Sequence, residues 1–156
     1  MTSKRSVPIW LFPVAYVIHV TEEFFGGAGL SLVPHSMEGI NLTPVQFILS
    51  TCVGALLMLF GLLIAQRRGF PHLLMIMLGT IFLINGLRHI GATLRAGAYN
   101  PGVITSPLVL IPLGAWTLRW LWGDMSARRY GFGVALGAGI YLAITLLAQN
   151  GRSLFG

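Results

Sequence analysis

Five long apolar runs, separated by short polar turns, constrain this chain more than any other feature of its sequence. Each run approaches the roughly 20 residues that a helix needs to cross about 30 Å of hydrocarbon. Only 9% of the 156 residues are charged, against about 25% in soluble domains. We therefore predict an all-α membrane protein, with one transmembrane domain over residues 1–156. The predicted helices, about five in number, cover residues 7–25, 45–65, 71–94, 103–122 and 130–147.

The connections predict the orientation of the bundle. Lys and Arg gather in the N-terminal segment and in the second and fourth connections, whereas the other side carries only Arg95 and Arg152. By the positive-inside rule the N-terminus is cytoplasmic and the C-terminus external, as in a protein of the bacterial inner (plasma) membrane. The basic residues on the cytoplasmic side are Lys4, Arg5, Arg67, Arg68, Arg128 and Arg129, with Arg119 close by.

The basic residues are compatible with two other interpretations. The net charge of +6 is typical of nucleic-acid binding, but here the charges lie in short clusters between apolar runs, so we predict no nucleic-acid partner. Lys4 and Arg5 before an apolar run also resemble a signal peptide. That alternative stays open, although no A-x-A cleavage site follows and the run carries acidic residues and a histidine.

Polar side chains inside the first and third runs are the strongest functional signal. An ionisable side chain at the membrane centre costs roughly 2.5–3.5 kcal/mol or more, and such residues usually face the bundle interior. Residues three and four apart share one helix face, and the two runs cross the membrane in the same direction. We therefore expect two facing patches in the outer half of the membrane. They comprise His19, Glu22 and Glu23 in the first run and Asn85, Arg88 and His89 in the third.

These residue types favour a metal centre. Two adjacent carboxylates cannot both stay charged in a dry interior, so one needs a cation. His19, His89 and one of Glu22 and Glu23 make a two-histidine, one-carboxylate ligand set, which suits zinc first and non-haem iron second. The other glutamate is then the candidate general base. Of the remaining patch residues, Asn85 is a candidate for orienting a substrate carbonyl and Arg88 for pairing with a carboxylate.

Structural explanations of the same residues remain open at this point. The glutamates can lie hydrated at the headgroup boundary, Arg88 and His89 can be interfacial anchors, or all six residues can form a salt-bridge network. His35 in the outer loop is a further candidate ligand. Tyr99, in the turn before the fourth run, is either a lid over the site or a residue of the interfacial aromatic belt.

The segment His19-Val20-Thr21-Glu22-Glu23 has the form H-x-x-E-E. Together with Asn85-x-x-x-His89 and the turn Tyr99-Asn100-Pro101-Gly102, it resembles the HXXEE family of small multi-pass bacterial membrane proteins. The resemblance extends from the first run to the start of the fourth. It marks the polar residues of both patches, but the family carries no established activity, so the resemblance implies no reaction.

Three functions are compatible with the sequence. The first is a metal-dependent hydrolase that acts on a lipid or lipid-like hydrophobic substrate in the outer half of the membrane, with membrane lipid as its surroundings. The second is a small proton- or ion-coupled transporter that uses the same Glu/His cluster. The third is a scaffold for a haem-type cofactor. We also expect the fifth run to pack through Gly133 and Gly137, within one chain or in a homodimer.

Overall fold

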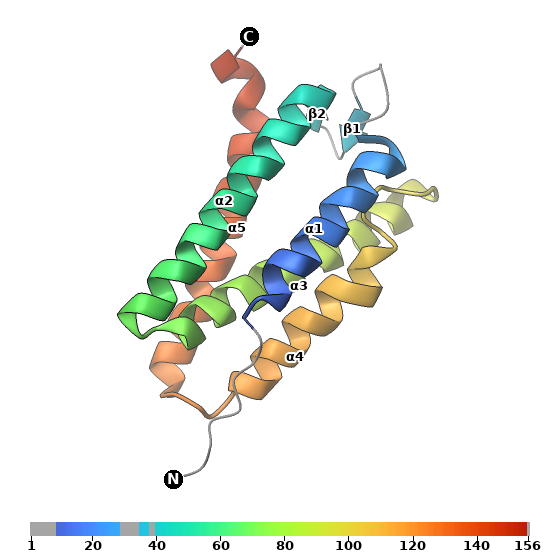
Figure 1. The fold of residues 1–156 in the computed structure, drawn as a ribbon. Coiled ribbons are helices and arrows are strands. Elements are labelled where there is room, and N and C mark those ends of the chain that lie inside the picture. The colour runs from blue at the N-terminus through green and yellow to red at the C-terminus, as the bar shows by residue number, and fades with distance from the viewer. Residues whose placement is uncertain (1–8, 29–34, 38–39, 156) are drawn as a thin grey trace.

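Five α-helices occupy the five apolar runs in the structure, a computed structural model that describes residues 9–28, 35–37 and 40–155. Two short π-helices adjoin them: η1 (Phe24–Ala28) continues the first helix and η2 (Ser106–Leu110) precedes the fourth. The α-helices are α1 (Leu11–Glu23), α2 (Pro44–Arg68), α3 (Pro71–Ala96), α4 (Ile111–Leu121) and α5 (Ala127–Phe155), shown in Figure 1.

Local sequence signals explain where these helices begin and end. Thr43 and Gln46 form a capping box at the start of α2, which satisfies backbone N–H groups that have no partner within the helix. Gly69 and Gly97 follow the ends of α2 and α3 with φ of 76° and 61°, a left-handed conformation that favours glycine. The fourth run was expected to be helical from residue 103, but residues 101–104 form a turn, which places Gly102 at φ 91°.

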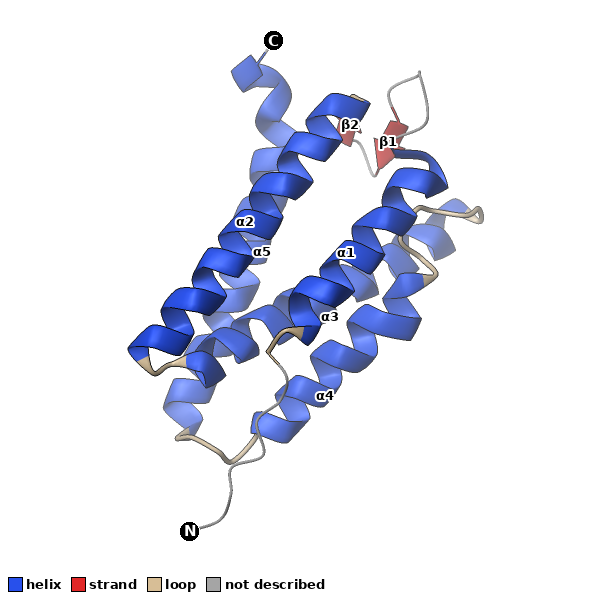
Figure 2. Ribbon diagram, in the orientation of Figure 1, coloured by secondary structure: helices blue, strands red, loops and turns tan. Residues whose placement is uncertain are grey.

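The connection between α1 and α2 contains two short strands that the all-α prediction did not include. Strands β1 (His35–Met37) and β2 (Ile40–Leu42) pair in antiparallel fashion, with His35 opposite Leu42 (Figure 2). The side chain of His35, the candidate further ligand, lies outside the described part of the structure.

Helix α3 is the centre of the bundle and packs closely on both α4 and α5. A Cβ atom on Gly114 of α4 would lie 2.6 Å from the carbonyl oxygen of Gly79, and one on Gly137 of α5 would lie 2.6 Å from that of Met77. A Cβ on Gly133 would meet Ile76 at 2.9 Å. The predicted packing through Gly133 and Gly137 thus occurs within one chain, against α3. The homodimer through these glycines stays a prediction.

Helices α1 and α2 are attached by side chains rather than by backbone contacts. Tyr16 of α1 reaches α2, where its hydroxyl donates to the carbonyl of Thr51 at 3.1 Å. The same hydroxyl lies 2.7 Å from the position a Cβ of Gly54 would take. One turn earlier on α1, the rings of Phe12 and Phe82 of α3 meet edge to face, with 5.3 Å between their centroids. Long side chains therefore keep α1 at a distance from its neighbours.

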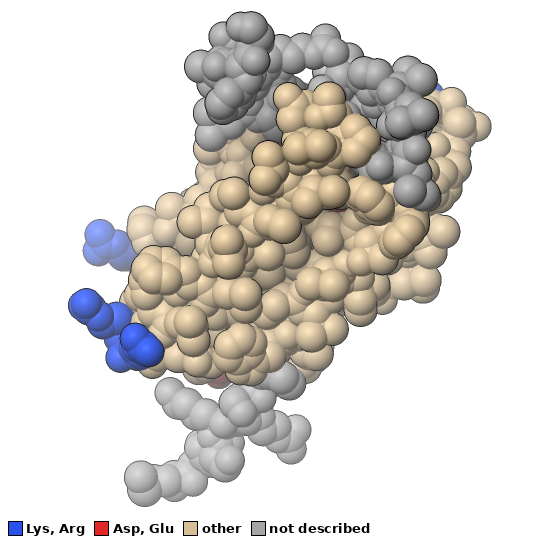
Figure 3. Space-filling model, turned by 45° about the horizontal axis from the view of Figure 1, so that its top comes forward, with Lys and Arg blue, Asp and Glu red and all other residues tan. Residues whose placement is uncertain are grey.

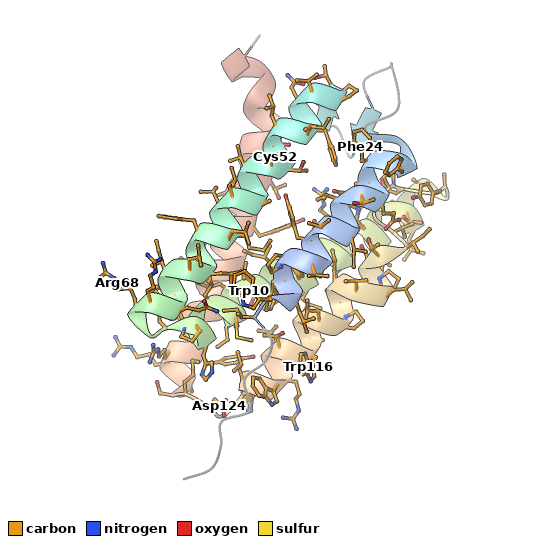
Figure 4. All side chains as sticks on the ribbon, viewed as in Figure 1. Trp10, Phe24, Cys52, Arg68, Trp116 and Asp124 are labelled. Atoms are coloured by element: carbon orange, nitrogen blue, oxygen red, sulfur yellow. The ribbon has the colours of Figure 1, made fainter. Side chains whose placement is uncertain are left out.

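The bundle has two unlike ends. In the view of Figure 3, most visible Lys and Arg side chains gather at one end. Figure 4 places Arg68 and Asp124 toward this end, whereas Phe24, the residue after Glu23, lies toward the other. Three stretches of the described chain are long and apolar enough to cross a membrane: Pro44–Arg68, Pro71–Ala96 and Ala127–Leu146. The continuous helical run 11–28 spans roughly 27 Å at 1.5 Å per residue.

Candidate metal centre

The facing patches of α1 and α3 bring two histidines and one glutamate together. Nε2 of His89 lies 3.2 Å from Oε1 of Glu23, and Nε2 of His19 lies 3.6 Å from the same oxygen. Each of the three residues offers one ligand atom, and these three atoms all lie within 4.8 Å of one another. The three residues are buried, with exposed fractions of 3%, 9% and 1% for His19, Glu23 and His89.

The separations suit a small cation. Bonds of about 2.0–2.2 Å in a tetrahedral site place neighbouring ligand atoms roughly 3.4 Å apart. The two measured separations, 3.2 and 3.6 Å, lie on either side of that value. His19 and Glu23 achieve this because residues four apart share a helix face. Among the described residues, Nε2 of His89 makes no hydrogen bond although it is buried, and its polar contact is the one with Oε1 of Glu23 at 3.2 Å.

A chain of hydrogen bonds orients His19. Tyr141 donates to Oδ1 of Asn85 at 3.3 Å, which turns the amide Nδ2 toward Nε2 of His19 at 3.1 Å. Nε2 is therefore the acceptor, so the ring proton is on Nδ1 and is donated to Oγ1 of Thr105 at 2.7 Å. Thr105 in turn donates to Oε2 of Glu22. This tautomer leaves Nε2 without a proton, so it can bind a metal ion once the Asn85 amide turns away.

Glu22 is separate from the three ligand candidates. Its carboxylate accepts hydrogen bonds from the backbone N–H groups of Ile104 and Thr105 at 2.9 and 2.7 Å. The hydroxyls of Thr105 and Tyr99 donate to it as well. Burial and the nearby carboxylate raise the pKa of the Tyr99 phenol above its ordinary value, which keeps it a protonated donor at neutral pH. Glu22 thus binds the start of the fourth helical run and reaches His19 through Thr105.

The turn before the fourth helix closes the centre from one side. Nδ2 of Asn100 lies 3.2 Å from Nδ1 of His89. Gly102 lies against both imidazoles, since a Cβ there would be 2.8 Å from Cε1 of His89 and 2.9 Å from Cε1 of His19. At φ 91° this position also favours glycine by its backbone conformation. Any side chain at residue 102 would push the two histidines apart.

Asn85 and Arg88 face a cavity beside the centre. The cavity has a volume of about 250 Å³, and His19 and Glu23 line it together with these two residues. In the structure Asn85 uses the lone pair of His19 Nε2. A metal ion bound to that nitrogen would take the same lone pair, so the Asn85 amide would have to turn toward the cavity.

Four further residues contribute to the centre beyond those predicted from the sequence. Thr105 and Tyr141 lie in apolar runs where hydroxyl groups are common, and Asn100 and Gly102 were interpreted only as part of a turn signal. The fifth run holds both Tyr130 and Tyr141, so the sequence alone does not single out Tyr141. The rest depends on contacts between helices distant in sequence, which residue spacing along a single helix does not reveal.

Comparison with known proteins agrees with the motif. The family described as proteins of unknown function with an HXXEE motif matches residues 10–117 of this chain. The chain belongs to this family. No curated protein and no solved structure matches it. The stretch matched by the HXXEE family contains all three ligand candidates, Glu22 and the turn at Gly102, whereas Tyr141 and the rest of α5 follow it.

Proposed function

We propose that this HXXEE protein binds one divalent metal ion at His19, Glu23 and His89, with zinc as the first candidate and iron as the second. The observation that carries the proposal is the convergence of three buried ligand atoms at separations of 3.2 and 3.6 Å around Glu23. Two histidines and one carboxylate are the ligands of several catalytic zinc and non-haem iron sites, which keep a coordination position open for water or substrate.

The reaction we propose is hydrolysis of an ester or amide linkage in a lipid or lipid-like substrate. Metal-bound water is a nucleophile at neutral pH. A metal ion held by His19, Glu23 and His89 would supply such a water. Hydrolysis would join the water oxygen to the carbonyl carbon, break the bond to the leaving oxygen or nitrogen, and pass a proton from the water to the leaving atom. The products are a carboxylic acid and an alcohol or amine, so the step needs no oxidant or reductant.

The remaining polar residues support this chemistry in different ways. Asn85 and Arg88 line the cavity next to His19 and Glu23, where an amide N–H and a positive charge stabilise the developing oxyanion. Glu22 is a positioning residue in this proposal, because its carboxylate is bonded to Ile104 and Thr105. This assignment replaces the general-base role that the sequence left open for the second glutamate.

Metal analysis of the purified protein tests the proposal. X-ray absorption at the zinc and iron edges should detect one ion per chain, and His19→Ala should abolish the signal. His72→Ala is the matched control, because His72 lies in the first turn of α3, near the opposite end of that helix from His89. Protein that is metal-free after purification and after incubation with either ion would refute the metal centre.

The proposed position in the membrane has its own test. If the basic turns are cytoplasmic, the centre lies in the outer half of the membrane. Reporter fusions after Arg68 and after Arg129 should then be cytoplasmic, and a fusion after Asn100 should be external. A cytoplasmic result at Asn100 would move the centre to the inner half without affecting its ligands.

One observation also favours a second candidate, a proton-coupled carrier. The hydrogen-bonded chain His19–Thr105–Glu22 connects groups that can pass protons, and intramembrane acids often serve such relays. Proton-linked uptake into vesicles by metal-free protein would favour the carrier.

The haem scaffold is less compatible with the geometry. The ring centroids of His19 and His89 lie 5.0 Å apart, and Glu23 lies beside both rings.

A further inference from the structure

The cavity beside the metal centre has walls from four of the five helices. Its lining includes Val20 of α1, Phe47 of α2, Ile81 of α3 and Thr145 of α5, with Leu110 of η2. Helix α2 forms one wall through Phe47, Ser50 and Thr51. The cavity thus lies where α2 faces α1, α3 and α5.

All five hydroxyl groups in this lining are hydrogen-bonded within the protein. Four of them donate to backbone carbonyls, and the fifth, on Tyr141, donates to Asn85 at 3.3 Å. Because these donors are used internally, the surfaces they leave toward the cavity are largely hydrocarbon. The four hydroxyls that donate to backbone carbonyls, at 2.9 to 3.1 Å, belong to Tyr16, Ser50, Thr51 and Thr145.

The polar lining is concentrated where the cavity meets the centre. His19 and Glu23 belong to both, and Asn85 and Arg88 line the cavity together with them. A divalent ion next to one carboxylate leaves net positive charge there, and Arg88 adds to it. A ligand that matches this lining has an apolar body and a carbonyl or carboxylate oxygen at one end, since hydrocarbon favours the apolar walls and the oxygen favours the cationic end.

The size of the cavity limits the apolar body. Pockets that enclose drug-sized ligands measure about 300–1,000 Å³, and this cavity measures about 250 Å³. It accommodates part of one hydrocarbon chain and excludes a second chain beside it. We propose that the cavity binds the chain of a single-chain acyl amphiphile, with its carbonyl or carboxylate group against the metal centre. This inference rests on the proposed hydrolase function and specifies its substrate class.

A photoreactive fatty acid tests the proposal directly. The probe is dodecanoic acid with a diazirine in its chain, added to the full-length protein in phosphatidylcholine nanodiscs, and labelled peptides are mapped by mass spectrometry. Val20→Trp and Thr145→Trp fill the cavity from α1 and from α5. Val17→Trp and Leu142→Trp are the matched controls, because these residues lie on the same helices and are 56% and 57% exposed.

We expect saturable labelling of cavity-lining peptides, reduced at least about tenfold in both filling variants, the change that a loss of 1.4 kcal/mol in binding produces. The two controls should label as the unaltered protein does. Equal labelling in filling and control variants would overturn the proposal. If Val20→Trp also loses metal, the outcome for Thr145→Trp decides, because that residue is on another helix.

Metal content measured on the same samples separates this inference from the proposed function. Full metal content with equal labelling in every variant would refute the chain site and leave the metal function standing. Protein without metal that still labels saturably, and less in the filling variants, would refute the metal function while supporting a hydrocarbon site.

Discussion

The two sides of this bundle are held together in different ways. On the side of α4 and α5, glycines bring the helices so close to α3 that a single added carbon would lie 2.6 Å from a backbone oxygen. On the side of α1 and α2, contact is made by the ends of long side chains such as Tyr16 and Phe12. The glycine contacts of α3 with α4 and α5 leave no space for a ligand, whereas a cavity lies where α1 and α2 face α3 and α5.

The metal centre lies at the boundary between these sides. Its histidines come from both, His19 from the loosely attached α1 and His89 from the central α3. Bonds to a shared ion would therefore connect α1 to the central α3. Function in such a bundle needs one rigid part that sets ligand geometry and one part that leaves room for the substrate.

The largest expected effect comes from removing this connection. His89→Ala and Glu23→Gln should each abolish metal binding, because either change leaves two ligands in an open site. We expect stoichiometry to fall from one ion per chain to none, measured by inductively coupled plasma mass spectrometry. Glu23→Gln protein that retains a full complement of metal would show that another carboxylate binds the ion.

The next effect concerns the tightly packed side. Gly137→Leu should destabilise the bundle by about 2–3 kcal/mol, since overpacking forces the backbones apart, and a lower thermal midpoint in detergent would report it. Gly139→Leu is the control, because a Cβ at Gly139 would meet no atom within 4 Å. Equal stability of both variants would mean that the close contact of α5 with α3 is incidental.

A smaller effect should follow from Glu22→Gln, which leaves all three ligands in place. A loss of about 10–100-fold in metal affinity is typical when a residue that orients a ligand is changed. If Glu22 acts through Thr105, then Thr105→Val should cause a similar loss, and the double variant should be no worse than the single ones. Additive losses in metal titrations would indicate that Glu22 contributes by a separate route.

The smallest effect should appear on the loose side. Gly54→Ala places a Cβ 2.7 Å from the Tyr16 hydroxyl, the end of a flexible side chain that can move away. We expect a cost below about 1 kcal/mol, close to that of the one hydrogen bond lost. Gly114→Ala, with its Cβ 2.6 Å from a backbone oxygen, should cost more in the same thermal assay. Equal costs would remove the distinction between the two sides.

Much of this arrangement could be predicted from spacing along the sequence. The apolar runs predicted five helices, and the interval of four residues placed His19 and Glu23 on one face. The common direction of the first and third runs predicted that His89 would lie at the same depth. The family resemblance was confirmed, because the HXXEE family matches residues 10–117.

The different positions of the two glutamates could not be predicted in this way. Glu22 and Glu23 are adjacent in the motif, and spacing alone makes either a ligand. The distinction depends on the fourth helical run, whose backbone N–H groups at Ile104 and Thr105 bind Glu22. Contacts of this kind arise only when distant segments meet, so they have no periodic signal in the sequence.

The tyrosine that starts the hydrogen-bond chain also has a consequence for the family as a whole. Tyr141 and Thr145 belong to α5, which follows the stretch that the HXXEE family matches. The candidate ligands His19, Glu23 and His89 and one wall of the adjoining cavity therefore come from separate parts of the polypeptide. Substitutions in the last helix can change which molecules fit the cavity without changing the candidate ligands.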